Sequence, residues 1–445
     1  MTADLRPPAA VVPVAEALRF WFRLGWISFG GPAGQIALMH EELVVRRRWI
    51  SERRFLHALN YCMLLPGPEA QQLATYLGWL MHRTWGGVVA GLLFVLPSLA
   101  ILVLLSWLYL AWGHTAWLAG MFYGIKPAVV AIVAQAAQRM ASRTLHHPLL
   151  WGLALLSFVL VWGLAVPFPW IVLGAALLGV AGGQGWPQVF AVGKGHAAAG
   201  TGDAAALIDD HTPIPAHAQF RAARLLQVLA LGALLWLLPM AVLTLTLGWT
   251  HTLTQMGWFF TKAALLTFGG AYAVLPYLYQ GAVGHYGWLT PTQMLDGLAL
   301  GETTPGPLIM VVAFVGFVGG YTEAFWGSGQ PWLAGLAAAL LVSWFTFLPS
   351  FVFILAGGPL VESSRHQPKL NAPLTAISAA VVGVIAHLAL FFAGHVLWPQ
   401  GLGSPPDLIA AGLAVAAALA LWVAKRPVLE VIAGAALLGW LLHVG

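Results

Sequence analysis

The sequence "SFGGPAGQI" at 28–36 recurs as "TFGGAYAVL" at 267–275, a separation of 239 residues (267 − 28). Further matches follow in the same order, at this separation or at a slightly larger one. They pair Trp49 with Trp288, "LLPGP" at 64–68 with "TTPGP" at 303–307, "LPS" at 96–98 with "LPS" at 348–350, and "GAALLG" at 174–179 with "GAALLG" at 434–439. Ordered matches of this kind indicate an internal repeat that covers roughly 15–186 and 255–445.

The composition is typical of a protein solvated by lipid. Hydrophobic residues fill 60% of the 445 positions and charged residues 8%, whereas soluble domains carry about 25% charged residues. Long apolar runs at 85–111, 223–248, 332–356 and 404–424 reach or exceed the roughly 20 residues that a helix needs to cross a bilayer. A β-barrel would show alternating segments of about 10 residues instead. The sequence therefore predicts an all-α, polytopic protein embedded in the lipid bilayer.

The charge balance and the single cysteine exclude other classes of protein. The net charge of +5 comes mostly from basic residues in the loops between apolar runs, where such residues set topology; we expect no nucleic-acid partner. Cys62 is the one cysteine, so an internal disulfide or a dithiol redox centre is excluded. We expect no cofactor and no metal. Residues 1–13 lack the apolar stretch of a cleavable signal peptide.

Between the two copies lie a polar stretch and one additional apolar run, 223–248. We predict an N-terminal membrane domain at 1–186, a polar cytoplasmic linker with a connecting transmembrane helix at 187–254, and a C-terminal membrane domain at 255–445. When each copy crosses the membrane an even number of times, one extra crossing places the second copy upside down. Inverted repeats of this kind are common in secondary transporters.

The distribution of basic residues favours the same inversion. First-copy loops that are rich in basic residues correspond to second-copy loops at 281–291, which has no Lys, Arg, Asp or Glu, and at 322–331, which has only Glu323. The basic residues of the first copy and linker are Arg46, Arg47, Arg48, Arg53, Arg54, Arg83, Arg139, Arg143, Lys194, Arg221 and Arg224, and those of the second-copy loops are Arg365, Lys369, Lys425 and Arg426. Placing every basic loop in the cytoplasm predicts a cytoplasmic N-terminus and a periplasmic C-terminus in the bacterial inner membrane.

The arginine-rich loop at 40–54 leaves two alternatives. It lies outside if 15–39 and 55–82 each cross the membrane fully, and inside if both segments are re-entrant. We favour the re-entrant or broken-helix form, because five arginines outside would violate the positive-inside rule.

Glycine and proline interrupt two apolar segments in each copy. The breaks are Gly30-Gly31-Pro32, Pro66-Gly67-Pro68, Gly269-Gly270 and Pro305-Gly306-Pro307. Proline lacks an amide donor and clashes with the preceding turn, so a straight helix cannot pass through the Pro-containing breaks. Interrupted helices at equivalent positions of two copies indicate a transport site, and the amides at half-helix N-termini suit an oxyanion. Proline and glycine also simply kink transmembrane helices, but four symmetric breaks favour the site.

Polar side chains cluster around these breaks. Candidate substrate-binding residues are Ser28, Gly30, Gly31, Gln35, Asn60, Pro66, Gly67, Pro68, Gln71, Gln72, Lys126, Lys262, Thr267, Gly269, Gly270, Thr303, Thr304, Pro305, Gly306 and Pro307. Candidates for carrying a proton or a coupling charge are His57, Glu69 and Glu302, since ionisable groups within a membrane are functional candidates by default. Two bland alternatives stay open: Lys126 snorkels from its helix end, and His57 satisfies a hydrogen bond.

The motifs "SFGGPAGQIALMHEELVVRRRWI" at 28–50 and "FLHALNYCMLLPGPEAQQLATYLGW" at 55–79 resemble those of the chromate ion transporter family, as do the "FGG" and "TPGP" elements of the second copy. The resemblance implies the long, two-domain form, whose members export chromate and confer chromate resistance. The second copy lacks counterparts of Gln35, Glu69, Gln71 and Gln72. We therefore expect the first copy to hold more of the substrate contacts.

Three other functions compete with chromate export. Transport of sulfate or another oxyanion fits the same polar cluster. A membrane enzyme is disfavoured, because "HEELV" at 40–44 lacks the second histidine of HExxH and no GxSxG motif occurs. Metal sensing by the linker would use His196, Asp209, Asp210, His211 and His217, although a connector rich in glycine and alanine with scattered histidines is more often only flexible. A homodimer is a candidate assembly, on which the sequence is silent.

Overall fold

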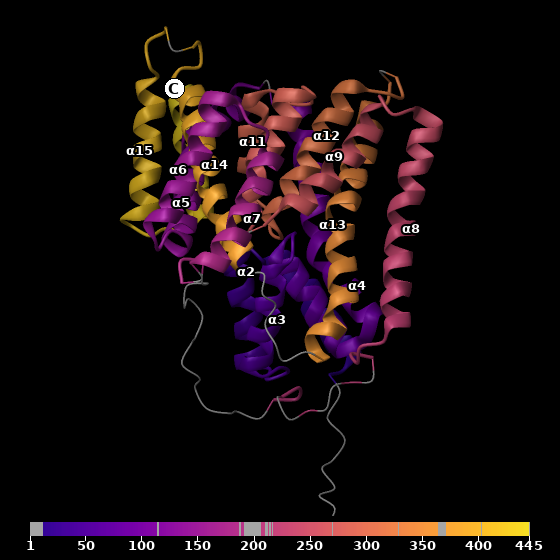
Figure 1. The fold of residues 1–445 in the computed structure, drawn as a ribbon. Helices are drawn as coiled ribbons and strands as arrows, with labels where there is room; N and C mark the ends of the chain where they lie inside the picture. Colours follow the sequence, from indigo (N-terminus) through magenta and orange to yellow (C-terminus); the bar gives the residue numbers. More distant parts are fainter. Residues whose placement is uncertain are drawn as a thin grey trace, which may run out of the picture.

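In the computed structural model the chain is almost entirely helical (Figure 1). The structure describes residues 12–113, 115–186, 188–190, 206–209, 212, 215, 217–268, 270–327, 329–363, 371–401 and 403–444. Within these residues the one β pairing is an isolated bridge between Ile50 and Ile208. The fold class predicted from the sequence is therefore confirmed.

The first copy begins with two hairpins of short helices. Its elements are α1 (Val14–Ile27), α2 (Gly31–His40), η1 (Glu41–Arg46), α3 (Glu52–Leu64), α4 (Glu69–Trp112), α5 (Ala116–Thr144), α6 (Pro148–Leu164) and α7 (Phe168–Gly185). The second hairpin ends inside α4, where His82 and Arg83 leave the helical conformation and the chain reverses. At about 1.5 Å per residue, α1 and α2 are too short to cross a hydrocarbon layer of about 30 Å. α3, with 13 residues, is equally short. The broken-helix form, one of the two favoured for 15–39 and 55–82, is thus the one adopted.

The second copy repeats this order of elements. They are α9 (Thr252–Leu266), η2 (Ala271–Val274), α10 (Leu275–Leu278), η3 (Tyr279–His285), α11 (Pro291–Thr303), η4 (Leu308–Met310), α12 (Val311–Glu323), α13 (Pro331–Ser363), α14 (Asn371–Leu397), α15 (Leu408–Trp422) and α16 (Val428–Val444). Even local chemistry is repeated: α3 begins at Ser51, which accepts a hydrogen bond from the Arg54 amide, and α11 begins at Thr290 in a full capping box.

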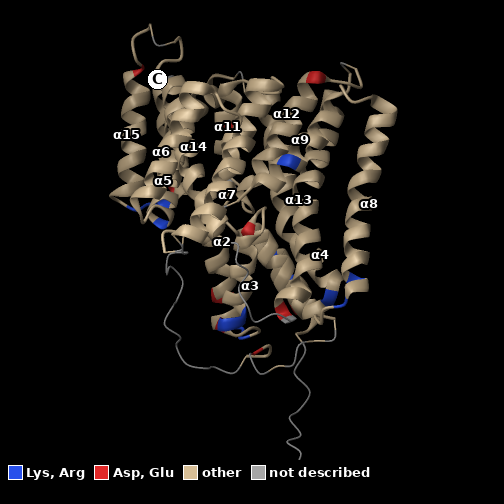
Figure 2. Cartoon of the chain, viewed as in Figure 1, with Lys and Arg blue, Asp and Glu red and all other residues tan. Residues whose placement is uncertain are grey.

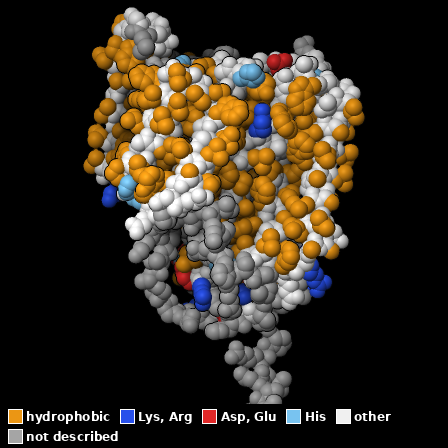
Figure 3. Space-filling view, in the orientation of Figure 1, with side chains coloured by type: hydrophobic (Ala, Val, Ile, Leu, Met, Phe, Trp, Pro, Cys, Tyr) orange, Lys and Arg blue, Asp and Glu red, His pale blue; other side chains and the backbone are white. Residues whose placement is uncertain are grey.

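The two copies are inverted, because α8 (Ala222–Leu247) connects them with one additional crossing. In Figure 1 the first-copy hairpin elements α2 and α3 lie in the lower half of the molecule, whereas α9, α11 and α12 lie in the upper half, in which the C-terminus also lies. Six helices of the described chain are long and apolar enough to cross a membrane, by length and composition: Glu69–Trp112, Ala116–Thr144, Phe168–Gly185, Ala222–Leu247, Pro331–Glu362 and Ala372–Leu397. Apolar side chains gather over the upper and middle parts of the face seen in Figure 3.

Most of the basic residues lie along one face of the molecule. Figure 2 shows Lys and Arg gathered at the lower ends of α3, α4, α5 and α8. This distribution agrees with the prediction that the basic loops share one side of the membrane. The predicted loop with Arg365 and Lys369, and Lys194 of the linker, lie outside the described residues.

The two copies are also interdigitated. α5 packs against α14, α15 and α16 of the other copy, and α14 packs against α5, α6 and α7, which is the symmetric arrangement. Glycines bring the backbones of α5 and α16 into direct contact, because a Cβ on Gly124 would lie 2.0 Å from the carbonyl oxygen of Ala435. Close backbone approach at small residues is the usual way in which helices associate in lipid.

We expect Gly124→Val to destabilise the protein strongly. The added side chain would overlap the backbone of α16, and overpacking a tight contact typically costs about 1–3 kcal/mol. The destabilisation is measured as a fall in the apparent melting temperature in detergent, which is read from the loss of the monodisperse size-exclusion peak on heating. Gly152→Val is the matched control, since a Cβ at Gly152 on α6 meets nothing within 4 Å. Equal melting temperatures for the two variants would contradict the proposed contact.

Part of the polar linker is docked on the first copy. The Ile208 amide donates to the Trp49 carbonyl at 3.0 Å, and the Ser51 amide donates to the Ile208 carbonyl at 3.0 Å. Further along, the His217 ring bonds to the Trp79 carbonyl at 3.0 Å. Among the described linker residues, Ile208 therefore holds the loop at 48–51, and His217 contacts the second hairpin.

Candidate functional site

The four helix breaks meet in two reciprocal pairs. The amide of Gly67, in the first Pro-Gly-Pro, donates to the Thr267 carbonyl at the second-copy break, with a distance of 2.8 Å. The amide of Gly306, in the second Pro-Gly-Pro, donates to the Ser28 carbonyl at the first-copy break, with a distance of 2.9 Å. Each break therefore joins one copy to the other at the centre of the molecule.

A serine from the opposite copy closes over each Pro-Gly-Pro glycine. Gly67 and Gly306 have φ angles of +125° and +97°, a region that favours glycine. A Cβ on Gly67 would lie 2.4 Å from the hydroxyl oxygen of Ser350, and one on Gly306 would lie 2.8 Å from the Cβ of Ser98. Both serines come from the repeated "LPS" motif, so the contact obeys the same symmetry as the backbone hydrogen bonds.

Helical segments that start at the breaks have no side-chain cap. α2, α4, η2 and η4 begin after Gly30, Pro68, Gly270 and Pro307, and no side chain of these four residues accepts a hydrogen bond from the helix amides. Away from the breaks, side chains cap α3, α6, α9, α11 and α15, whereas α1, α5, α7 and α8 also begin without a side-chain cap. The four N-termini at the breaks therefore differ from the others in their convergence, not in the missing cap. Uncapped N-termini offer free N–H donors and a partial positive charge. They can bind an oxyanion.

The first-copy glutamines brace the breaks. The side-chain amide of Gln35 donates to the Gly306 carbonyl and, at 3.2 Å, to the Ser28 carbonyl. The amide of Gln72 donates to the Pro66 carbonyl at 2.8 Å and to Ser350 at 3.3 Å. The side-chain oxygens of Gln35, Gln71 and Gln72 and the hydroxyl of Ser98 are buried and have no partner among the described residues. Unsatisfied buried polar atoms are rare in native proteins and often mark functional positions.

Two half-buried carboxylates lie next to the Pro-Gly-Pro breaks. Glu69 follows Pro68 directly and makes no side-chain hydrogen bond among the described residues, whereas Glu302 accepts a hydrogen bond from the Tyr272 hydroxyl at 2.5 Å. The structure therefore places Glu69 and Glu302 each directly beside a Pro-Gly-Pro break.

Lys126 belongs to a charged cluster that the sequence analysis missed in part. Its ammonium group lies 3.7 Å from a carboxylate oxygen of Asp296, whose other oxygen accepts a hydrogen bond from the Tyr109 hydroxyl at 2.9 Å. Asp296 is only 2% exposed. The cluster joins α4 and α5 of the first copy to α11 of the second. A single acid within the apolar part of α11 was the available signal, because buried ionisable residues are rare in membranes.

Three other predicted residues point away from the breaks. The Lys262 ammonium lies over the ring of Trp258, 5.6 Å from the ring centroid. Trp258 lies one turn before Lys262 on α9, whereas the break lies after Lys262, so the lysine side chain points away from the break. His57 is exposed and contacts the Val361 carbonyl at 3.4 Å, and Asn60 is exposed without a hydrogen bond among the described residues. Gly269 lies outside the described residues.

Four predicted hydroxyl groups bond within their own helices. Ser28 and Thr267 donate to the carbonyls four residues earlier, at 2.6 and 2.7 Å. Thr303 and Thr304 donate to the carbonyls three residues earlier, at 2.9 and 3.0 Å. These hydroxyls line the breaks but their protons are already engaged, which leaves the backbone amides as the free donors.

Comparison with known proteins identifies the family. The sequence profile of the chromate transporter family matches residues 15–180 and 254–440. The chain belongs to the chromate transporter family. A chromate transport protein of Pseudomonas aeruginosa is 35% identical over 454 residues, covering 99% of this chain and 95% of the relative. One of Cupriavidus metallidurans is 29% identical over 432 residues, covering 97% and 94%.

An uncharacterized transporter of Bacillus subtilis is 30% identical over 148 residues, covering 33% of this transporter and 75% of the relative. The match to a shorter relative agrees with an architecture built from repeats. No solved structure matches the chain significantly.

A small cavity lies beside one of the breaks. A cavity of about 10 Å³ beside the second Pro-Gly-Pro is lined by Tyr272, Leu275, Leu298, Gly301, Glu302, Leu308 and Val311, and a volume of this size holds about one water molecule. This cavity is smaller than a tetrahedral oxyanion.

The linker histidines form no metal site in the described part of the chain, where no group of three or more His, Cys, Asp or Glu side chains converges. His217 bonds to the Trp79 carbonyl, and Asp209 accepts hydrogen bonds from Thr212. His196, Asp210 and His211 lie outside the described residues.

Proposed function

We propose that this transporter exports chromate across the bacterial inner membrane and so confers chromate resistance. The observation that carries the proposal is the set of four uncapped helical N-termini at the interlocked breaks. Their amides provide donors for the oxygens of a tetrahedral dianion, and their partial positive charge offsets its negative charge. The names of the relatives supply chromate as the substrate to test first.

The membrane potential suffices to drive this export. Moving one elementary charge across 100 mV is worth about 2.3 kcal/mol, so a dianion that leaves a cell with a negative interior gains about 4.6 kcal/mol. Proton exchange would add to this drive. Glu69 and Glu302 are the candidate proton carriers because each lies beside a break and is half-buried.

The proposed orientation puts the N-terminus in the cytoplasm and the C-terminus in the periplasm, because the positive-inside rule then holds for the basic face. The functional units are the first repeat at 1–186, the linker with α8 at 187–254, and the second repeat at 255–445. Alternating access would move the two pairs of hairpins against the interdigitated α5–α7 and α14–α16 helices. A homodimer stays a prediction.

Sulfate is the second candidate substrate, since it shares the charge and the tetrahedral shape of chromate. Flux of radiolabelled chromate and of radiolabelled sulfate into inside-out proteoliposomes distinguishes the two, with the potential and the pH gradient imposed separately. We expect chromate flux that rises with an inside-positive potential. Flux of neither anion would overturn the proposed function, and sulfate flux alone would replace the substrate.

We expect Glu69→Gln to change the pH dependence of chromate flux. The variant keeps the size and hydrogen-bonding capacity of the side chain but cannot release a proton, so any step that requires ionisation of Glu69 loses its pH response. Initial flux rates at a fixed potential over a pH series measure the effect. Glu323→Gln, at the end of α12 and away from the breaks, is the control. An unchanged profile in Glu69→Gln would leave this carboxylate with a structural role.

A further inference from the structure

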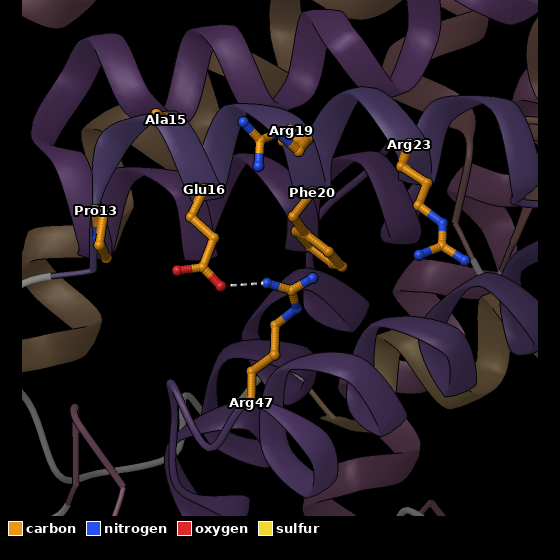
Figure 4. Close-up of a pocket in the computed structure, with 7 residues that line it drawn as sticks. All are labelled: Pro13, Ala15, Glu16, Arg19, Phe20, Arg23 and Arg47. Atoms are coloured by element: carbon orange, nitrogen blue, oxygen red, sulfur yellow. Dashed lines mark hydrogen bonds and ion pairs between the residues drawn. The ribbon is translucent and has the colours of Figure 1, made fainter.

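A pocket of about 450 Å³ lies outside the proposed transport site, between α1 and the turn that follows η1 (Figure 4). It is lined by Pro13, Ala15, Glu16, Arg19, Phe20, Arg23 and Arg47. Three of its seven lining residues are arginines and one is acidic. The lining therefore attracts anions.

One arginine of the pocket is fixed and two are free. The guanidinium of Arg47 pairs with Glu16 at 2.7 Å and with Glu42 at 3.4 Å, and it lies over the Trp49 ring, 4.8 Å from the centroid. Arg19 and Arg23 are exposed, and neither has an ion pair or a hydrogen bond within the described chain. They project from successive turns of α1, and both line the pocket.

An apolar stripe continues from these arginines along the same helix. Phe22, Trp26 and Ile27 are 54%, 45% and 40% exposed. At the helical spacing of i, i+3, i+4, i+7 and i+8 they share one face with Arg19 and Arg23. The arginines lie toward the start of α1 and the apolar residues toward the break at its end. This face thus changes from basic to apolar in the direction of the membrane centre, as a phospholipid does from headgroup to acyl chains.

We propose that this pocket binds the phosphate headgroup of an anionic phospholipid, with the acyl chains lying along Phe22, Trp26 and Ile27. Arginine is suited to the headgroup because its planar guanidinium forms paired hydrogen bonds with phosphate oxygens. Basic pockets at the membrane surface of helical proteins recognise anionic headgroups. A free phosphate could bind the arginines equally well, but it would not contact the exposed apolar stripe of Phe22, Trp26 and Ile27. We therefore assign the pocket to a phospholipid.

Nearby acids do not neutralise the site. Glu41 and Glu42 pair with Arg46 at 3.1 and 2.9 Å, and Glu16 is engaged by Arg47. The positive charge of Arg19 and Arg23 therefore remains available. Because α1 ends at the Ser28 break, a bound lipid would also steady the first hairpin.

Native mass spectrometry of the full-length protein tests the assignment, with phosphatidylglycerol and phosphatidylethanolamine offered in equal amounts. We expect the wild type to retain phosphatidylglycerol and the double variant Arg19→Gln, Arg23→Gln to retain about 25-fold less of it. This figure follows because each arginine near an anionic headgroup contributes about fivefold to the affinity. Arg221→Gln, Lys425→Gln removes two exposed charges elsewhere on the basic face and should retain lipid as the wild type does.

Competition with glycerol phosphate separates the two sources of phosphate. We expect no displacement of the lipid at equal concentration, because the soluble analogue lacks acyl chains. Displacement would overturn the lipid assignment in favour of a free anion. Equal lipid retention by the Arg19, Arg23 double variant and the wild type, or equal loss in the control variant, would overturn the site itself. Since the lipid-retention readout does not involve flux, it is independent of the proposed transport function.

Discussion

Gly67→Leu is expected to reduce chromate flux by about tenfold to a hundredfold while the protein still reaches the membrane. Gly67 has a φ of +125°, and a side chain in this region costs about 1–3 kcal/mol. The new atoms would also overlap the Ser350 hydroxyl and the Gln72 side chain, which lie 2.4 and 2.6 Å from the position of a Cβ. Both must move, which breaks the bond from Gln72 to the Pro66 carbonyl and displaces the start of α4.

The control for this variant must separate the effect of backbone strain from the effect of a side chain placed at the break. Gly401→Leu introduces the same kind of strain at a φ of +98°, in a loop where a Cβ meets nothing within 4 Å. It should express and transport like the wild type. Flux in proteoliposomes containing equal amounts of each variant, normalised to protein in the membrane, decides the matter. Wild-type flux in Gly67→Leu would remove the Pro-Gly-Pro break from the site.

The symmetry of the breaks extends this prediction to the second copy. Gly306 has a φ of +97° and faces Ser98 in the way that Gly67 faces Ser350. Gly306→Leu should therefore reduce flux as strongly as Gly67→Leu, even though the second copy lacks the glutamines. A mild effect at Gly306 alone would show that the first copy binds the anion without its partner.

Asp296→Asn is expected to lower both stability and flux. The buried carboxylate holds the Lys126 ammonium at 3.7 Å and accepts the Tyr109 hydroxyl at 2.9 Å. Removing one member of a fully buried ion pair costs about 3–5 kcal/mol. Lys126 keeps 26% of its side chain exposed, so solvent reduces this to about 1–3 kcal/mol. The melting temperature and the flux of the purified variant measure the two effects.

A double variant separates structure from transport at this cluster. Asp296→Asn with Lys126→Met removes both charges, so the melting temperature should return most of the way to that of the wild type. We expect flux to stay low, because the lysine is then absent as a counter-charge for the anion. Recovery of flux together with stability would show that the pair is structural only.

Membrane class, internal repeat and inversion were predictable because they depend on patterns that are local or periodic. Apolar runs of about 20 residues identify crossings in any context, and the repeat at 28–36 and 267–275 needs only a constant separation. The re-entrant hairpins were predictable from loop charge. Glycine and proline marked the breaks because their backbone limits hold in every fold.

Tertiary structure alone decided which residues meet. The repeat indicates that Gly67 and Gly306 occupy equivalent positions. It does not indicate that the amide of each glycine bonds to the break of the other copy, because that depends on how the copies pack. The packing of α5 against α11 likewise brought Lys126 against Asp296. Side-chain direction is set by packing against distant helices. The sequence alone therefore determined where the breaks lie, and the packing of the two copies determined which residues surround them.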